Sequence, residues 1–197
     1  PDTAGSGGRV VGNLKRLFLA AAVDPEVKAM LAQHLAAWTL PGKVVPPDNW
    51  HLTVRFLGWI DQVRAEILTA QLDQAGLGPP FDLVLGEMGS FPKSTRANVL
   101  WLGVEDRTQG LARLNRITEE VSRTGGLRAE ERPFTAHLTL SRLRPPEHVA
   151  GLIESYDAQR FRWTVHDLTL FESKQGPMYV EVDRFELRET QRSSRRS

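Results

Sequence analysis

HLTVRF at positions 51–56 returns later in the chain as a near-copy, HLTLSR at positions 137–142. Each copy places a histidine two residues before a threonine in a run rich in leucine and valine, the composition of a β-strand. Because successive side chains of a strand point to opposite faces, the histidine and the threonine of each copy share one face. The pair therefore predicts two motif strands, each with an imidazole and a hydroxyl on one surface and an apolar surface turned to the core.

Helices and strands are expected to alternate around these motif strands. Asp24 is placed to cap a helix that starts at Pro25. Strands are predicted over 15–23, 50–57, 81–85, 98–104, 135–143, 161–171 and 178–187, and helices from 25 to before 41, over 60–76 and 108–124, and from 145–147 to near 156, with a polar loop at 89–95.

The order of these elements favours an α+β fold. No glycine-rich phosphate loop opens any predicted helix, so the sequence lacks the key residues of the Rossmann and P-loop folds. The uniform strand-helix-strand spacing of a doubly wound parallel sheet is also missing. The chain instead divides into two half-domains with one motif strand each, a weak internal repeat. We therefore predict two lobes whose sheets are mainly antiparallel.

Composition limits the class of protein. The 197 residues are enough for one large domain or two small lobes, and a composition of 41% hydrophobic and 25% charged residues is typical of a globular protein. No apolar run approaches the roughly 20 residues that span a bilayer, and no signal sequence precedes the first strand, so we expect a cytoplasmic protein and no membrane association. The sequence has no cysteine, which excludes disulfides, thiolate nucleophiles and thiolate metal ligands.

Charge argues against a protein that follows a long nucleic-acid backbone. The formal net charge is only +1, and four arginines fall in the last ten residues. A nearly neutral body is compatible with binding one phosphate or the end of a strand. The basic C-terminal segment is expected to be a solvated tail.

Two histidines on neighbouring polar faces suit acid–base chemistry at phosphorus. With an ordinary pKa near ~6.5, one imidazole can accept a proton from a nucleophile while the other donates one to a leaving oxygen. Threonine hydroxyls on the same faces can donate hydrogen bonds to the non-bridging phosphate oxygens. No cluster with metal-ligand spacing accompanies either motif, so no metal or other cofactor is expected. One such motif is weak evidence, and the two together favour a functional site.

Other candidates have ordinary structural explanations. His34, His148 and His166 are predicted to be structural or surface residues, since none has the histidine–threonine pattern. Strand alternation places Arg55 on the same face as His51 and Thr53. It could contact a nucleic-acid backbone there, or could simply be solvated. Phe18 and Phe171 could stack on a base, but we expect them in the core.

HLTVRFLG and RPFTAHLTLSR resemble the two signatures of the 2H phosphoesterases, and in particular the RNA 2',3'-cyclic phosphodiesterase branch, also called 2'-5' RNA ligases. The similarity extends to RLFLA at 16–20, VPPDNWHLT at 45–53, VLWLGV at 99–104 and LFES at 170–173. It covers about 14–187, the proposed single domain, and leaves 1–13 and 188–197 as flexible tails.

This resemblance implies a bilobal 2H-phosphoesterase-like fold, with pseudo-symmetric lobes around a central cleft. It also implies metal-independent hydrolysis of a 2',3'-cyclic phosphate, on RNA ends or small cyclic nucleotides, to a 2'-phosphomonoester. By the family pattern His51 is the proton donor to the leaving 3'-oxygen and His137 the proton acceptor that activates water. Thr53 and Thr139 bind the phosphate. We expect a monomer.

Two positions stand apart from the family pattern or from simple strand alternation. Ala136 precedes the second histidine where family members often have proline. Arg142 matches a family arginine that would bind the phosphate, yet its offset of five from His137 puts it on the wrong strand face. It could reach the phosphate only if the strand ends or twists near Ser141; otherwise it forms a salt bridge elsewhere.

Two other functions remain open at this stage. One is the reverse reaction, which joins RNA ends through a 2'-5' linkage at the same site. The other is a non-catalytic module that binds RNA 3'-ends, which would have no need of the complete set of two histidines and two threonines.

Overall fold

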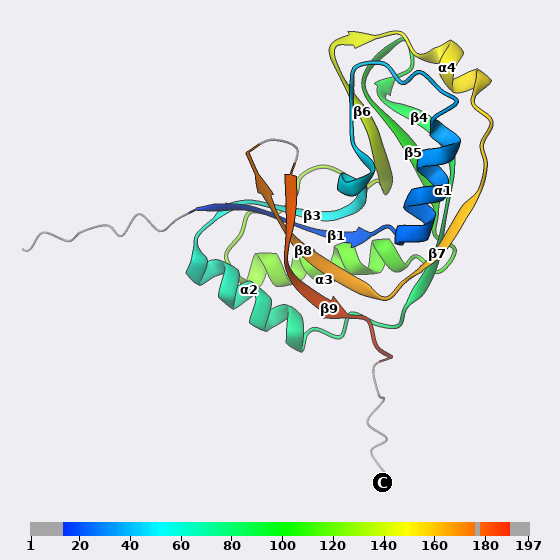
Figure 1. Ribbon diagram of the computed structural model, residues 1–197. Coiled ribbons are helices and arrows are strands. Elements are labelled where there is room, and N and C mark those ends of the chain that lie inside the picture. The colour runs from blue at the N-terminus through cyan, green and yellow to red at the C-terminus, as the bar shows by residue number, and fades with distance from the viewer. Residues whose placement is uncertain (1–13, 176–177, 190–197) are drawn as a thin grey trace, which may run out of the picture.

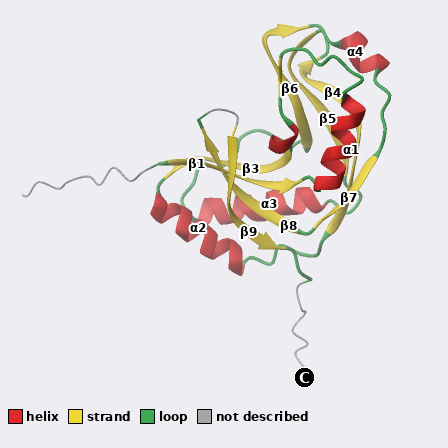
Figure 2. Ribbon diagram, viewed as in Figure 1, coloured by secondary structure: helices red, strands yellow, loops and turns green. Residues whose placement is uncertain are grey.

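The computed structural model describes residues 14–175 and 178–189 of an α+β protein (Figures 1 and 2). The strands are β1 (Lys15–Ala22), β2 (Lys43–Val44), β3 (His51–Ile60), β4 (Phe81–Lys93), β5 (Arg96–Glu105), β6 (His137–Glu147), β7 (Phe161–Val165), β8 (Asp167–Lys174) and β9 (Met178–Glu186). The helices are α1 (Pro25–Leu35), α2 (Gln62–Gln74), α3 (Gly110–Thr124) and α4 (Ala150–Ser155), with a short 3-10 helix at Pro47–Asn49.

All strand pairings are antiparallel, and the strands follow the order β7-β4-β5-β6-β3-β1-β8-β9, with β2 added beside β6. We call β3, β1, β8 and β9 the first half and β6, β5, β4 and β7 the second half. The two motif strands, β3 and β6, are neighbours where the halves meet. They pair at one position, Leu52 with Leu138. The predicted pair of antiparallel lobes is therefore confirmed, and this single pair joins them into one sheet.

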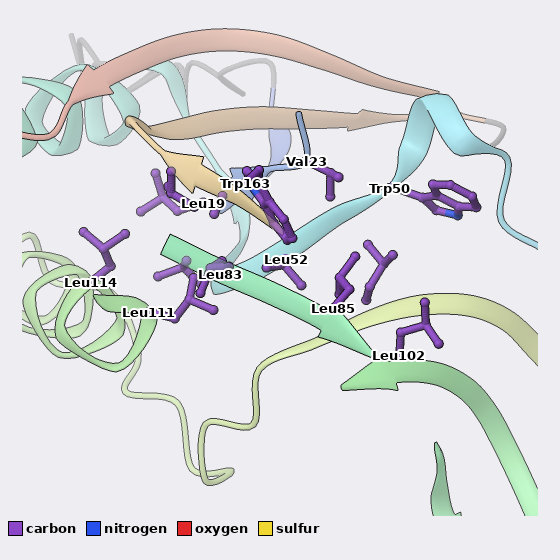
Figure 3. Close-up of a cluster of buried hydrophobic side chains, with 14 of the residues drawn as sticks. Leu19, Val23, Trp50, Leu52, Leu83, Leu85, Leu102, Leu111, Leu114 and Trp163 are labelled. Atoms are coloured by element: carbon purple, nitrogen blue, oxygen red, sulfur yellow. The ribbon is translucent and has the colours of Figure 1, made fainter. Parts of the chain in front are cut away.

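The helices connect the two halves (Figure 1). Helix α1 follows β1 of the first half but contacts β7 of the second, whereas α3 follows β5 of the second half and contacts β3 of the first. Helix α2 packs on α3 and β9. The buried side chains of Leu52, Leu83 and Leu111 gather between the halves (Figure 3). Because α1 and α3 each pack against the half to which they do not belong in sequence, the two halves share one core.

Side-chain caps start the helices near the predicted positions. The Asp24 carboxylate accepts hydrogen bonds from the Glu26 and Val27 backbone N–H groups at 2.8 and 3.3 Å. Asp61 accepts one from the Arg64 N–H at 2.9 Å. Such caps satisfy backbone donors that have no partner within the helix.

Three element predictions were wrong because tertiary pairing extended or divided a strand. The polar loop expected at 89–95 is mostly strand, since β4 runs to Lys93 and pairs with β5. Residues 145–147, expected to open a helix, belong to β6, and α4 begins only at Ala150. The single strand expected over 161–171 is two strands: β7 pairs with β4 in the second half, and β8 pairs with β1 in the first.

The predicted tails fall mostly outside the described residues, which leave out 1–13 and 190–197. Arg188, the first residue assigned to the C-terminal tail, forms a bridge with Gly78. Among the described residues, no helix is both long and apolar enough to cross a membrane.

Candidate active site

A cleft of about 870 Å³ lies where the two halves meet, and both motif strands line it. His51, Thr53, His137 and Thr139 all face this cleft, so the structure brings together the four residues that the two motifs predicted. Its other lining residues include four arginines and several aromatic or amide side chains: Arg16, Arg132, Arg142, Arg144, Phe18, Phe56, Phe91, Tyr179, Asn49 and Asn98.

The His51 ring is fixed by two hydrogen bonds. Its Nδ1 lies 2.7 Å from the backbone oxygen of Asn49, and its Nε2 lies 3.0 Å from Thr53 Oγ1. A carbonyl oxygen only accepts hydrogen bonds, so Nδ1 carries a proton and donates it. In the neutral imidazole Nε2 is therefore the basic nitrogen, and it accepts from the threonine hydroxyl.

His137 repeats the first of these two contacts in the second half. Its Nδ1 donates to the backbone oxygen of Thr135, again two residues earlier, at 2.8 Å. Each histidine is thus held in the same tautomer by the chain that leads into its own strand. The nitrogen left for chemistry in the cleft is Nε2 in both residues.

Aromatic rings surround both imidazoles. The ring centroids of Phe18 and Tyr179 lie 4.7 and 5.0 Å from that of His51, and the Tyr179 ring is nearly perpendicular to the imidazole. Phe18 is only 3% exposed, stacks on Phe171 at 5.4 Å and lines the cleft, so it is buried as expected but on the cleft side of β1 and not in the main core. Phe171, also expected in the core, is partly exposed. On the other side, Phe91 meets His137 edge-on at 5.0 Å. These apolar walls reduce the hydration that would stabilise an imidazolium ion.

Burial lowers the pKa of both histidines. The pKa of His51 falls to about 4, chiefly through burial and further through the positive charges of Lys28 and Arg142, against the opposing hydrogen bond to Asn49. Burial is also the main cause that lowers the pKa of His137, and Arg142 contributes. In the absence of a bound anion, both imidazoles are therefore neutral at pH 7.

We expect the His51 ring to titrate near pH 4 in the free protein, which NMR of the imidazole resonances measures. Because its pKa in the unfolded chain is about 6.5, the unfolded state binds more protons between these values. The free energy of unfolding should therefore fall as the pH drops from about 6.5 toward 4, and His51→Gln should remove part of that dependence. A His51 resonance that titrates at or above its ordinary pKa would contradict the burial argument.

A β-bulge in β3 decides where Arg55 points. Against β1, Ala20 pairs with Thr53 and Leu19 pairs with Arg55, so Val54 is an extra residue. A bulge of this kind shifts the alternation by one. Arg55 therefore turns to the buried side and is only 5% exposed. The prediction that it faces the cleft or the solvent was wrong.

The same irregularity occurs in β6 and explains Arg142. Against β5, Trp101 pairs with Thr139 and Leu100 pairs with Ser141, which leaves Leu140 as the extra residue. Ser141 is fully buried, and Arg142 returns to the motif face, where it lines the cleft. Simple alternation placed Arg142 on the wrong face, and the bulge restores the placement that the family resemblance implied.

Several cleft residues were not singled out from the sequence. Arg132 stands in the RPFTAH stretch that carried the family resemblance, and this was the available signal for it. Arg16 and Phe56 had the same signal, since they stand in the RLFLA and HLTVRFLG stretches. Tyr179 reaches the cleft through the pairing of β9 with β8, for which the sequence offered no signal. Among the described residues, no group of three or more histidine, aspartate or glutamate side chains is arranged to hold a metal ion.

The remaining histidines lie outside the cleft, as predicted. His34 Nε2 lies 3.0 Å from the backbone oxygen of Asp157, next to the Tyr156 and Phe161 rings. His148 and His166 are exposed.

Comparison with known proteins agrees with this geometry. The family model described as the 2'-5' RNA ligase superfamily matches residues 13–177. An RNA 2',3'-cyclic phosphodiesterase of Archaeoglobus fulgidus is 29% identical over 87% of this chain and 99% of its own. Crystal structures of Escherichia coli LigT cover 88% of this chain and 98% of their own: the complex with 3'-AMP has a TM-score of 0.76 at 26% identity, and the complex with NADP+ has 0.70 at 25%. The chain belongs to the 2'-5' RNA ligase superfamily.

Proposed function

We propose that this protein is an RNA 2',3'-cyclic phosphodiesterase, which opens a terminal 2',3'-cyclic phosphate to a 2'-phosphomonoester. The observation that carries the proposal is the pair of histidines, one from each half, that line one cleft with Nδ1 bound to the backbone and Nε2 as the nitrogen available for proton transfer. The RNA 2',3'-cyclic phosphodiesterases among its relatives support the same reaction. Both histidines come from one chain, which supports an enzyme that acts as a monomer.

Each side chain has a role in this reaction. His137 accepts a proton from water as the water oxygen bonds to phosphorus, and His51 donates a proton to the 3'-oxygen as its bond to phosphorus breaks. Thr53 and Thr139 donate hydrogen bonds to the non-bridging oxygens, where negative charge grows. Arg142 supplies a positive charge to the same phosphate. The choice of His51 as the acid rests on the family resemblance.

The lowered pKa of His51 fits the role of acid. A protonated imidazole with a pKa of about 4 is a strong acid and transfers its proton readily to a leaving oxygen. The disadvantage of a low pKa is that only a small fraction of His51 rings is protonated near pH 7. The anionic phosphate of the substrate offsets this disadvantage, because a negative charge beside an imidazole raises its pKa.

The pH dependence of the rate follows from the lowered pKa values of His51 and His137. Since the free protein holds both imidazoles neutral above pH ~6.5, kcat/KM should fall by about tenfold per unit as the pH rises beyond that value. Initial rates on adenosine 2',3'-cyclic phosphate between about pH 5 and 9 measure the slope. A rate that increases steadily with pH would contradict a histidine proton donor.

The experiment that tests the function uses one substrate and a chelator. The protein is incubated with an oligonucleotide that ends in a 2',3'-cyclic phosphate, in the presence of EDTA, and the product isomer is identified by chromatography. The proposal predicts a 2'-phosphate and an unchanged rate with EDTA. A 3'-phosphate would overturn the assignment of His51 as the acid to the 3'-oxygen, and inhibition by EDTA that added metal reverses would overturn the metal-independent mechanism.

A matched pair of inhibitors tests recognition of the product. NADP+ carries a 2'-phosphomonoester on its adenosine ribose, the same group that the reaction leaves, and NAD+ lacks it. Since LigT has been crystallised with NADP+, we expect NADP+ to inhibit competitively, with an inhibition constant about tenfold or more below that of NAD+, through charge-assisted bonds to the extra phosphate. Equal inhibition by the two would mean that the cleft does not recognise a 2'-phosphate.

Ligation is the second candidate, supported by the name of the superfamily. If the 5'-hydroxyl of a second RNA replaces water, the same attack on phosphorus forms a 2'-5' linkage and releases the 3'-hydroxyl. The two histidines keep their roles. Incubation of cyclic-ended RNA with an excess of a 5'-hydroxyl oligonucleotide, followed by electrophoresis, separates joined RNA from hydrolysed RNA.

A further inference from the structure

A buried ion pair lies beneath the first motif strand, outside the cleft. Arg55 of β3 and Glu119 of α3 meet at 2.6 Å between Nε and Oε2. The arginine side chain is 4% exposed and the glutamate side chain 28%. The Nη1 group of Arg55 also donates to the backbone oxygen of Phe56 at 2.8 Å. Neither charged group lines the cleft, so neither touches the substrate.

The pair holds the segment that leads to the second motif strand. Residues 127–136, which we call the connector, join α3 to β6 without regular secondary structure. Nη2 of Arg55 donates to the backbone oxygen of Arg128. On the other side of the pair, Glu119 Oε1 accepts a hydrogen bond from the Glu130 N–H at 3.1 Å. Each member of the ion pair therefore binds one residue of the connector backbone.

The far end of the connector belongs to the site. Arg132, Pro133 and Thr135 line the cleft, and the Thr135 backbone oxygen fixes the tautomer of His137. A segment that is anchored at 128 and 130 therefore reaches a cleft arginine at 132 and the partner of a catalytic imidazole at 135.

Helix α3 also supports the bulge that turns Arg55 inward. The Asn115 side chain donates to the backbone oxygen of Val54, the extra residue of that bulge, at 2.8 Å. Asn115 and Glu119 are one helical turn apart and so lie on the same side of α3. One face of α3 thus binds both the backbone of the bulge at Val54 and the side chain of Arg55, the next residue.

The fold itself does not require a charge at this place. In the second half, the bulge of β6 puts Ser141 at the equivalent position, fully buried and uncharged. A buried ion pair pays a desolvation penalty and is often no better for stability than well-packed apolar residues. The bulge is therefore compatible with a small side chain, and the arginine has a different explanation.

We propose that Arg55 and Glu119 form a positioning pair, which couples the first motif strand to the connector and so sets Arg132 and His137 at the cleft. The pair acts across the two halves: Arg55 belongs to the strand of His51, and the connector orients His137. The expected change in kcat/KM rests on the proposed function. The expected effect on the connector rests on the structure alone.

A matched pair of glutamates on α3 tests it. Glu119→Gln removes the charge opposite buried Arg55, whereas Glu120→Gln removes the charge of an exposed pair, Glu120 with Arg123, whose side chains are 63% and 66% exposed. Well below the unfolding temperature, we expect Glu119→Gln to lower kcat/KM for the cyclic substrate by about tenfold or more, since small misplacements at a site are costly. Glu120→Gln should stay within about twofold.

Two further variants separate positioning from stability. Arg55→Lys keeps a positive charge opposite Glu119 but lacks the planar fork that also reaches Arg128, so it should fold and still lose kcat/KM. Arg55→Met combined with Glu119→Gln should lose no more kcat/KM than the worse single variant, because both changes break one coupled unit.

Hydrogen exchange of the connector gives a readout that does not depend on turnover. Amides at 128–135 should exchange faster in Glu119→Gln than in Glu120→Gln. If the wild type turns over the substrate and Arg55→Lys or Glu119→Gln matches it in kcat/KM, or if connector exchange is the same in both glutamine variants, the positioning pair is overturned. Absence of turnover in the wild type would instead overturn the proposed function and leave the exchange result to decide on the pair.

Discussion

Replacement of His137 by alanine is expected to lower kcat for the cyclic substrate by about 10²–10⁴-fold, the contribution of a positioned acid–base group. The ring lies at the cleft with its Nδ1 held by Thr135, so alanine removes the nitrogen that takes the proton from water. His51→Ala should cause a loss of similar size, because the 3'-oxygen would then leave without a proton. Steady-state kinetics with the cyclic-ended oligonucleotide measures both.

Controls separate lost chemistry from lost structure. His148→Ala changes an exposed histidine outside the cleft and should keep wild-type kinetics. If the two imidazoles act in one concerted step, the double variant should be little worse than either single variant. A folded His51→Ala or His137→Ala variant with near wild-type turnover would refute the paired mechanism.

The second large effect is expected on stability, from Leu138→Ala. Leu138 is fully buried and pairs with Leu52 at the one position where β3 and β6 meet. Truncation of a buried leucine removes apolar burial and leaves a cavity, at a cost of about 2–5 kcal/mol of unfolding free energy. Urea titration followed by circular dichroism measures the shift in midpoint.

An exposed leucine offers the matched control. Leu14 is 51% exposed, so Leu14→Ala should change the unfolding free energy by no more than about 0.5 kcal/mol. A loss below about 1 kcal/mol in Leu138→Ala would mean that the core between the halves collapses around the missing side chain.

Local chemistry made much of this fold predictable. The alternation of His51 and Thr53 with apolar neighbours identified the motif strand and its polar face correctly. Asp24 and Pro25 started α1 where expected, since a cap needs only neighbouring residues. These features depend on a few consecutive positions, so they can be recognised from the local sequence.

The failures came from pairing over long distances. Val54 and Leu140 look like any apolar strand residue, yet each is the extra residue of a bulge, and the pairing partner that reveals it lies elsewhere in the chain. Arg55 was therefore placed on the wrong face, and its partner Glu119 is 64 positions away. The segment 89–95 reads as a loop by composition, yet 89–93 are strand because β5 pairs with them.

The order in which the strands occur has a consequence for synthesis of the protein. The chain lays down β1 and β3, then completes the second half, and returns for β8 and β9. Phe171 and Tyr179, which pack around Phe18 and His51, come from those returning strands. On the ribosome, His137 and its strand are therefore made before the surroundings of His51 are complete. A nascent or truncated chain that lacks the last two strands has both histidines but lacks Ser173 and Tyr179, the cleft residues that these strands supply.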